Sequence, residues 1–173
     1  MITSECFQGK LDNVRCGSNN TSIKDAAADL LLMIGHDKWI YGSENKKSLF
    51  GFSTLASGNT WKWLILYMGK CYQDLDPVLK HCSISDVPLF WDSAQGMNCK
   101  DQRVKKFWKD VNVCGYGSGL SIPLRSSSGL LGLISVFSDN TLNDSRCLFD
   151  DNLLRIKQIG DAIHYAVERL MNR

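Results

Sequence analysis

The sequence predicts an α+β domain, an α-β-α sandwich with a central five-stranded antiparallel sheet. Three observations support this fold class. Short apolar segments rich in β-branched and aromatic residues occur five times. Four of these segments form two pairs separated by short polar turns, as in β-hairpins. Amphipathic helical patterns lie between the segments and after the last one, and hairpins interrupted by helices favour one sheet covered by helices.

Length and composition fit one globular domain. The chain has 173 residues, of which 44% are hydrophobic and 22% charged. A net charge of +2 is too small to indicate nucleic acid or an anionic membrane as a partner. No apolar run is long enough to span a bilayer, and the N-terminus lacks the features of a signal peptide. The seven cysteines have no zinc-like spacing, which predicts reduced thiols in a cytoplasmic protein without a metal or other cofactor.

The first half of the chain predicts an arm, two helices and a hairpin. Residues 1–21 are polar, so we expect a flexible arm before a domain over 22–173. Helix ends are inferred from capping residues, and Gly69 is a typical stop signal. The expected elements are a helix over 22–34 capped by Thr21 or Ser22, strands over 38–42 and 48–54 joined by a turn over 43–47, a helix over about 60–69 capped by Asn59 or Thr60, and a helical turn over 76–82 after Pro77.

The second half predicts three strands and two helices. Gly129 suits the turn of the strongest hairpin. The expected elements are a strand over 87–92, an amphipathic helix over 100–112, a hairpin over 117–125 and 130–138, and a long helix over about 150–172. The element order α-β-β-α-β-α-β-β-α is typical of GAF-like or PAS-like sensor domains. Such a layout encloses a cavity between the sheet and one helical layer.

One group of residues in this pattern suggests a binding site. Trp63 and Tyr67 are four residues apart and so share one helix face, and Asp76 follows shortly before Pro77. Buried aromatic side chains with polar tips need hydrogen-bond partners, and a buried carboxylate is costly without a donor. The simplest explanation is core packing with these groups satisfied internally. The addition of Trp91 at its spacing favours a ligand instead.

In these motifs the chain resembles the autoinducer-binding domain of LuxR-type quorum-sensing regulators, which bind N-acyl-homoserine lactones. The resemblance runs from about 22 to 172. It rests on four motifs in order: W-x3-Y from Trp63, D-P-V from Asp76, P-x2-W ending at Trp91, and G-x3-P-L from Gly119. The resemblance implies the same α-β-α sandwich and a regulator rather than an enzyme.

The resemblance also implies roles for individual residues in the head-group site. Trp63 is expected to donate to the lactone carbonyl, and Asp76 to accept the amide N–H of the ligand. Tyr67 is expected to donate to the acyl carbonyl, with Ser135 as a second donor. This donor and acceptor set matches the chemistry of the ligand, which has one amide donor, several carbonyl acceptors and an apolar tail.

The remaining site residues are expected to shape the cavity. Trp91 packs against the lactone ring, Gly119 leaves room beside it, and Ser121 lies on the same strand. Leu133 is bulky for a strand position that faces the tail, which suggests a short tail pocket. Many family members carry an aromatic residue near the acyl chain where this sequence has Asn59, so the chain-length preference of relatives cannot be transferred to this chain. The candidate tail-lining residues are Ile40, Gly42, Met68, Val78, Leu79, Phe107, Leu131 and Leu133.

The sequence leaves several alternatives open. Family members bind DNA through a C-terminal helix-turn-helix domain, and no such pattern follows the last helix here. The sequence is therefore either a piece of a longer regulator or a receptor without a DNA-binding half that inhibits full-length partners as a heterodimer. We expect a homodimer that uses the last helix. A GAF-like sensor of another small molecule is the other alternative, and a nucleophile set of His81, Cys82 and Asp76 is disfavoured.

Overall fold

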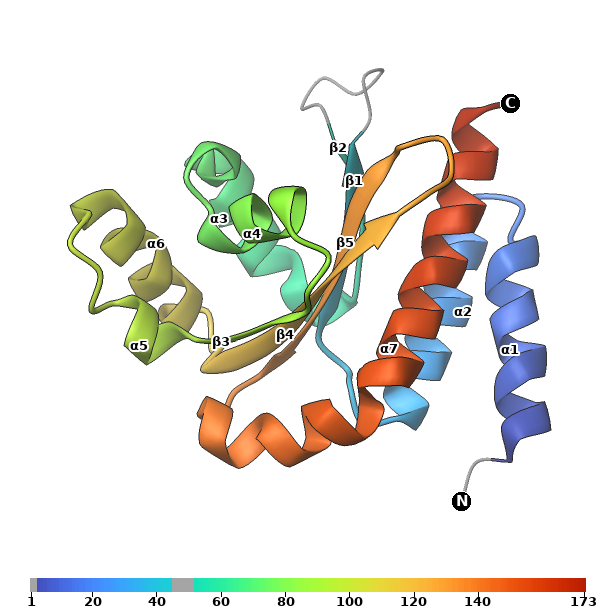
Figure 1. Ribbon diagram of the computed structural model, residues 1–173, viewed down its shortest axis with the longest axis horizontal. Coiled ribbons are helices and arrows are strands. Elements are labelled where there is room, and N and C mark those ends of the chain that lie inside the picture. The colour runs from blue at the N-terminus through green and yellow to red at the C-terminus, as the bar shows by residue number, and fades with distance from the viewer. Residues whose placement is uncertain (1–2, 45–51) are drawn as a thin grey trace.

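The computed structural model is a three-layer α-β-α sandwich, and it describes residues 3–44 and 52–173 (Figure 1). All strand pairs in the central sheet are antiparallel, in the order β2-β1-β5-β4-β3. The predicted fold class is therefore confirmed. The strands are β1 (Trp39–Glu44), β2 (Phe52–Ala56), β3 (Leu89–Asp92), β4 (Ser118–Arg125) and β5 (Leu131–Ser138). Much of the predicted segment 43–54 falls on residues 45–51, which lie outside the described residues.

Helices cover both faces of the sheet (Figure 1). One face carries α1 (Ser4–Cys16), α2 (Asn20–Met33) and α7 (Leu142–Met171). The opposite face carries α3 (Trp61–Gly69), α4 (Pro77–Ile84), α5 (Ser93–Gly96) and α6 (Gln102–Val113). Short 3-10 helices lie at Gly58–Thr60 and Tyr72–Asp74. The structure thus adds α1, α5 and these turns to the elements predicted from the sequence.

The flexible arm predicted for residues 1–21 is wrong for residues 4–16, which form α1. Thr3 caps the helix by accepting from the N–H of Cys6. Phe7, Leu11 and Val14 follow at helical spacing and are buried against the rest of the domain. These three residues stand among polar ones, which makes the segment as a whole look like a solvated arm.

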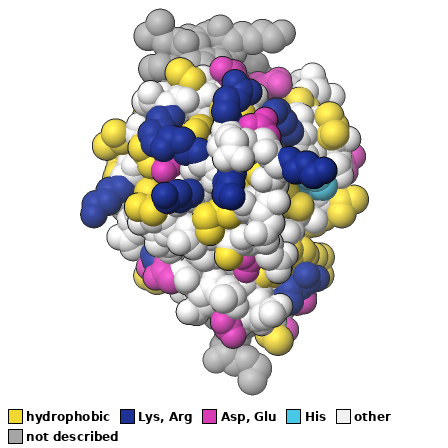
Figure 2. Space-filling view, turned by 90° about the vertical axis from the view of Figure 1, so that its left-hand side faces the viewer, with side chains coloured by type: hydrophobic (Ala, Val, Ile, Leu, Met, Phe, Trp, Pro, Cys, Tyr) yellow, Lys and Arg dark blue, Asp and Glu magenta, His cyan; other side chains and the backbone are white. Residues whose placement is uncertain are grey.

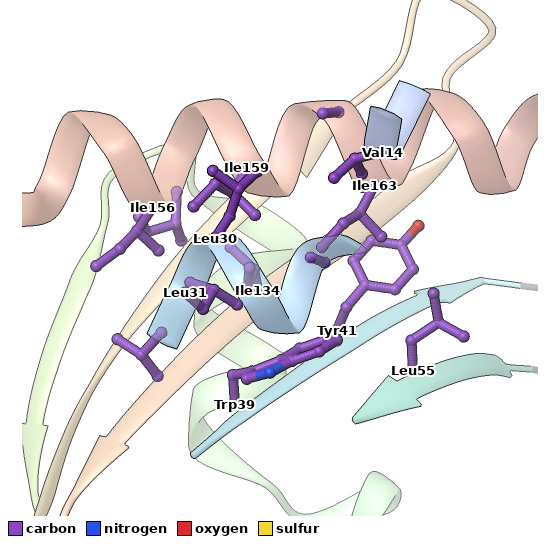
Figure 3. Packing of buried hydrophobic residues seen from close by; sticks show 14 of the residues in the cluster. Val14, Leu30, Leu31, Trp39, Tyr41, Leu55, Ile134, Ile156, Ile159 and Ile163 are labelled. Atoms are coloured by element: carbon purple, nitrogen blue, oxygen red, sulfur yellow. The ribbon is translucent and has the colours of Figure 1, made fainter. Parts of the chain in front are cut away.

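The layer of α1, α2 and α7 forms a tightly packed core with the sheet (Figure 3). Leu30 and Leu31 of α2, Ile134 of β5 and Ile156 of α7 have no solvent exposure. Tyr41 is also fully buried here, with its hydroxyl 2.8 Å from Nδ1 of His164. The hydroxyl of Tyr41 thus has a hydrogen-bond partner within this core.

Helix ends differ from the predictions where a better cap lies upstream. Asn19 caps α2, and its side chain and that of Ser22 form a reciprocal capping box. Helix α7 begins at Leu142, capped by Thr141, which is eight residues before the predicted start at 150. The hairpin of β4 and β5 is confirmed, and Gly129 adopts φ +84° in its turn.

Candidate functional site

Three cavities lie between the sheet and the α3–α6 layer. The inner cavity, of about 80 Å³, is bordered by Trp63, Trp91 and Ser135. The outer cavity, of about 390 Å³, lies beside α3 and is bordered by Tyr67 and Met68. The side cavity, of about 230 Å³, lies next to α4 and includes Leu79, Cys82 and Leu131. The packed face on the other side of the sheet supplies few of these linings, so the candidate site belongs to one face.

Asp76 lies in the wall that separates the inner cavity from the outer one. It borders both cavities and is only 9% exposed. Its Oδ1 accepts from the backbone N–H groups of Val78 (2.8 Å) and Leu79 (3.2 Å), so it caps α4. Its Oδ2 accepts from the hydroxyl of Tyr67 at 3.0 Å. No Lys or Arg forms an ion pair with this carboxylate within the described part of the chain.

The protonation of this pair follows from its burial. Burial raises the pKa of Asp76 to about 6, although the N–H groups of Leu79 and Val78 and the Tyr67 hydroxyl act in the opposite direction. Burial and then the nearby Asp76 raise the pKa of Tyr67 far above its usual value. Tyr67 therefore stays protonated and donates, while Asp76 at neutral pH is a buried acceptor with lone pairs left on Oδ2.

Trp63 supplies a donor at the inner cavity. It is 6% exposed and packs in an aromatic cluster with Tyr67, Tyr72 and Phe107, at ring-centroid distances of 5.5 to 5.9 Å. Within the described residues, its indole N–H has no hydrogen-bond partner. The cluster fixes the ring, so the N–H of a rigid side chain remains available to a ligand.

A short hydrogen-bond chain lies on the strand side of the inner cavity. The indole N–H of Trp91 donates to Oγ of Ser121 at 3.1 Å, and this oxygen is 2.7 Å from Oγ of Ser135. The two hydroxyls have two hydrogens and use one between them, so the other remains for a further acceptor. Both serines border the inner cavity. This chain was not predicted, because it joins residues of three strands.

Gly119 acts through Trp91 in the structure. The two residues are paired across β4 and β3, and a Cβ on Gly119 would lie 2.2 Å from Cζ2 of Trp91. Gly119 borders none of the three cavities within the described residues. Gly119 was predicted to leave room beside the ligand head group. In the structure it leaves room for the indole of Trp91, which forms part of the cavity wall.

The apolar residues predicted to line the tail pocket are divided among the cavities. Leu133 borders all three. Ile40, Val78 and Phe107 border the inner cavity, Gly42 and Leu79 border both the outer and the side cavity, Met68 borders the outer one and Leu131 the side one.

Several aromatic residues of the cavity wall were not predicted from the sequence. Trp108, Tyr116 and Phe137 border the inner cavity. The rings of Tyr116 and Phe137 are stacked with centroids 4.8 Å apart, although the residues lie on a loop and on a strand. For Trp108, helical spacing with Val104 and Val111 on α6 was a usable signal.

The competing nucleophile set is not assembled. Nε2 of His81 lies 2.8 Å from the carbonyl oxygen of Val87, so the ring is directed to backbone and not to Cys82. Burial, followed by the negative charge of Asp76, raises the pKa of the Cys82 thiol to about 12. A protonated, buried thiol without a base is a poor nucleophile.

A match to a known protein family shows which family the chain belongs to. The family described as "Autoinducer binding domain" matches residues 19–167. The chain belongs to the autoinducer-binding domain family of LuxR-type regulators. This membership covers most of the chain, including every candidate site residue. It agrees with a sensor domain of quorum-sensing transcription regulators and not with an enzyme family.

Curated relatives of this domain are transcriptional activators. The chain is 28% identical over 132 residues to the transcriptional activator protein VanR of Vibrio anguillarum, which covers 76% of the chain and 49% of VanR. It is 29% identical over 104 residues to AnoR of Acinetobacter nosocomialis, which covers 60% of the chain and 42% of AnoR. The chain thus spans about half the length of the relatives it matches.

Solved structures share the fold at low identity. CepR2 of Burkholderia cenocepacia, an N-acylhomoserine lactone dependent LuxR family factor, superposes with a TM-score of 0.76 at 17% identity, over 95% of this chain and 94% of that one. SdiA1-171 of Escherichia coli gives 0.69 at 17% identity, over 96% and 94%. A phycoerythrobilin-bound GAF domain gives 0.55 at 14% identity, over 96% of both chains. The GAF-like architecture predicted from the element order is therefore confirmed.

Proposed function

We propose that this domain binds an N-acyl-homoserine lactone across the wall formed by Asp76. The lactone ring occupies the inner cavity, where its carbonyl accepts from the indole N–H of Trp63 and its ring packs against Trp91. The ligand amide N–H donates to Oδ2 of Asp76. The acyl tail continues past Leu133 into the outer cavity. The observation that carries this proposal is a buried carboxylate that borders two cavities and forms no ion pair with a Lys or Arg of the described residues.

The acyl carbonyl has two candidate donors. The prediction assigned it to Tyr67, but the Tyr67 hydroxyl already donates to Asp76 at 3.0 Å. The hydrogen that Ser121 and Ser135 do not use between them is the alternative donor. We therefore assign the carbonyl to Ser135, with Tyr67 holding the carboxylate in place. Each such hydrogen bond contributes about 1 kcal/mol net, and an unpaired buried partner costs about 1–3 kcal/mol.

Ligand binding is coupled to folding in this proposal. A ligand that fills the cavities and forms hydrogen bonds with Asp76 and Trp63 binds only the folded state and therefore stabilises it relative to the unfolded state. The stabilised domain then forms a homodimer through α7, whose exposed side chains include Leu154 and Tyr165 at 75% and 57% exposure. In a longer regulator this dimer controls DNA binding by a separate domain. A heterodimeric inhibitor remains the alternative for a protein without that domain.

Thermal unfolding with a series of ligands tests the proposal. Acyl-homoserine lactones of four to twelve carbons are added at a hundred times Kd, at which the free energy of unfolding should rise by about 2.7 kcal/mol. Free homoserine lactone and a free fatty acid of matched length are the controls. SdiA has been solved with octanoyl-rac-glycerol, so that glycerol ester is a further arm. An unchanged melting temperature at every chain length refutes the proposal, and a response to the glycerol ester alone favours a sensor of another amphiphile.

A further inference from the structure

Unpaired basic side chains are concentrated on the outer surface of α6. Residues 100–109 include five basic residues and one acidic residue, whereas the whole chain has a net charge of only +2. Arg103, Lys105, Lys106 and Lys109 are exposed, and none of them has an ion-pair partner within 4.0 Å in the described residues. Their helix uses its apolar side, with Phe107 and Trp108, for the core. The basic side is thus free for a partner.

Helix α3 extends this surface. Lys70, which directly follows α3, pairs with Asp110 of α6 at 2.5 Å and so links the end of α3 to α6. The positive charges of Lys62 and Lys70 both act on the thiol of Cys114 at the end of α6. Figure 2 views this side of the molecule and shows Lys and Arg side chains spread across it, with hydrophobic side chains between them.

Exposed apolar side chains accompany these charges. Ile65 of α3 is 65% exposed and Val113 of α6 is 76% exposed. Trp61 and Met68 of α3 are exposed as well and border the outer cavity, so its mouth opens beside this surface. We name the surface of Lys62, Ile65, Lys105, Lys106, Lys109 and Val113 the α3–α6 face.

The combination of charge and apolar exposure identifies the kind of partner. A phosphate backbone of nucleic acid attracts lysines but gains little from exposed Ile, Val and Trp side chains. The interface of an anionic bilayer attracts both, because lysines meet lipid headgroups while apolar side chains enter the boundary with the acyl chains. No helix in residues 3–44 and 52–173 is long and apolar enough to cross a membrane, so contact would be at the surface.

We propose that the α3–α6 face docks this domain on the surface of an anionic phospholipid bilayer. The net charge of the whole chain did not indicate a membrane partner, because acidic residues elsewhere balance the cations that the fold brings together on one side. Docking here leaves α7, on the opposite side of the sheet, free for another copy of the chain (Figure 1). The proposal does not depend on the identity of the ligand.

Vesicle co-sedimentation tests the proposal. The chain is mixed with vesicles of 70% phosphatidylcholine and 30% phosphatidylglycerol, and with vesicles of phosphatidylcholine alone. We expect binding only to the anionic vesicles, with a partition coefficient that falls steeply as salt is raised. The triple variant K105Q/K106Q/K109Q should bind roughly 100-fold more weakly, at about fivefold per cation near the surface.

Matched variants separate charge, apolar contact and nucleic acid binding. The variant K10Q/R155Q/R173Q removes the same charge from outside the α3–α6 face and should bind as the wild type does. The variant I65S/V113S should weaken vesicle binding severalfold while unfolding at an unchanged temperature. The proposal is overturned by equal binding to both vesicle types, by no binding, or by an undiminished K105Q/K106Q/K109Q variant. Binding to a duplex DNA probe that is tighter than vesicle binding and insensitive to I65S/V113S would overturn it too, in favour of nucleic acid.

Discussion

The two faces of the sheet differ in how closely their side chains pack against the covering helices. On the face of α1, α2 and α7, residues such as Leu30, Ile134 and Ile156 are completely buried, and glycines admit close contact (Figure 3). A Cβ on Gly160 would lie 2.7 Å from a methyl carbon of Ile134. On the side of the sheet that α3, α4, α5 and α6 cover, three cavities remain, and the carboxylate of Asp76 is buried between two of them.

Under the proposed function, this difference separates stability from ligand recognition within one small domain. Close-packed interiors gain the most from burial and tolerate little change in volume. The looser face leaves hydrogen-bonding capacity and empty volume that a ligand can use, at a cost in stability that the packed face offsets. Adjacent residues of one strand therefore have different tasks, because successive side chains point to opposite faces.

The largest expected effect contrasts Ile134 with Leu133 on β5. Ile134→Ala opens a hole in the packed face and should lower the free energy of unfolding by about 4 kcal/mol. Leu133→Ala enlarges space that already exists and should cost about 1 kcal/mol. Urea unfolding of both variants measures the difference.

The same pair sharpens the ligand hypothesis. Because Leu133 borders all three cavities, its truncation should join them and shift the preferred acyl-homoserine lactone to a longer chain. Ile134→Ala should leave the chain-length preference unchanged. Equal stability losses in the two variants, or tightest wild-type binding at the longest chains, would contradict this contrast and the short tail pocket expected from Leu133.

Two buried titratable groups, one on each face of the sheet, contribute opposite pH dependences to the stability of the domain. Burial lowers the pKa of His36 on the packed face to about 4, against its usual 6.5, so the unfolded chain binds more protons between these values. Stability from this group is present above pH 6.5 and is lost as pH falls toward 4. The pKa of Asp76 is raised from 3.8 to about 6, so the folded chain binds more protons there, and stability is lost as pH rises through this window.

Each shift corresponds to about 3 kcal/mol over its full window. His36→Leu should therefore reduce the loss of stability between pH 6.5 and 4 relative to the wild type. Asp76→Asn, which keeps a good N-cap residue, should stabilise the ligand-free domain by about 2 kcal/mol at pH 8 and weaken ligand binding at least tenfold. Melting temperatures from pH 4 to 8 report both effects. A less stable Asp76→Asn variant at pH 8 would show that the ionised carboxylate is not a burden to the fold.

An intermediate effect is expected at two glycines of the sheet. Gly119→Ala forces Trp91 to move and breaks its bond to Ser121, which should cost about 2 kcal/mol and most of the ligand affinity. Gly42→Ala is the matched control on the same face, because its new Cβ would meet nothing within 4 Å. It should change stability by less than about 0.5 kcal/mol. Similar losses of stability in both variants would exclude a special role for Gly119.

The smallest effect concerns the serines of β5. Ser135→Ala removes the proposed donor to the acyl carbonyl and should weaken binding about fivefold, which is about 1 kcal/mol. Ser138 lies on the other face, where its Oγ accepts from the hydroxyl of Ser145 at 2.8 Å. Ser138→Ala should reduce stability without changing affinity. Calorimetric titration of both variants with the same ligand tests the difference. Equal ligand affinities of Ser135→Ala and Ser138→Ala would indicate that Tyr67, and not Ser135, donates to the acyl carbonyl.

The sequence predicted what local patterns encode. Alternation and turn residues revealed the hairpin of β4 and β5, and helical spacing placed Trp63 and Tyr67 on one helix face, where their rings lie 5.6 Å apart. The bond from Trp91 to Ser121 depends on strand order, which no local pattern gives. The helix of Phe7, Leu11 and Val14 was missed because composition was weighed above spacing, and the α3–α6 face because whole-chain charge was weighed above its distribution.

The central claim is that Oδ2 of Asp76 receives the amide N–H of a ligand lying between the inner and outer cavities. Calorimetric titration of the wild-type domain with an acyl-homoserine lactone and with its ester analogue, in which oxygen replaces the N–H, tests this directly. We predict at least a tenfold weaker Kd for the ester, because the carboxylate then faces an oxygen without a proton. Equal affinity for the amide and the ester would contradict the account.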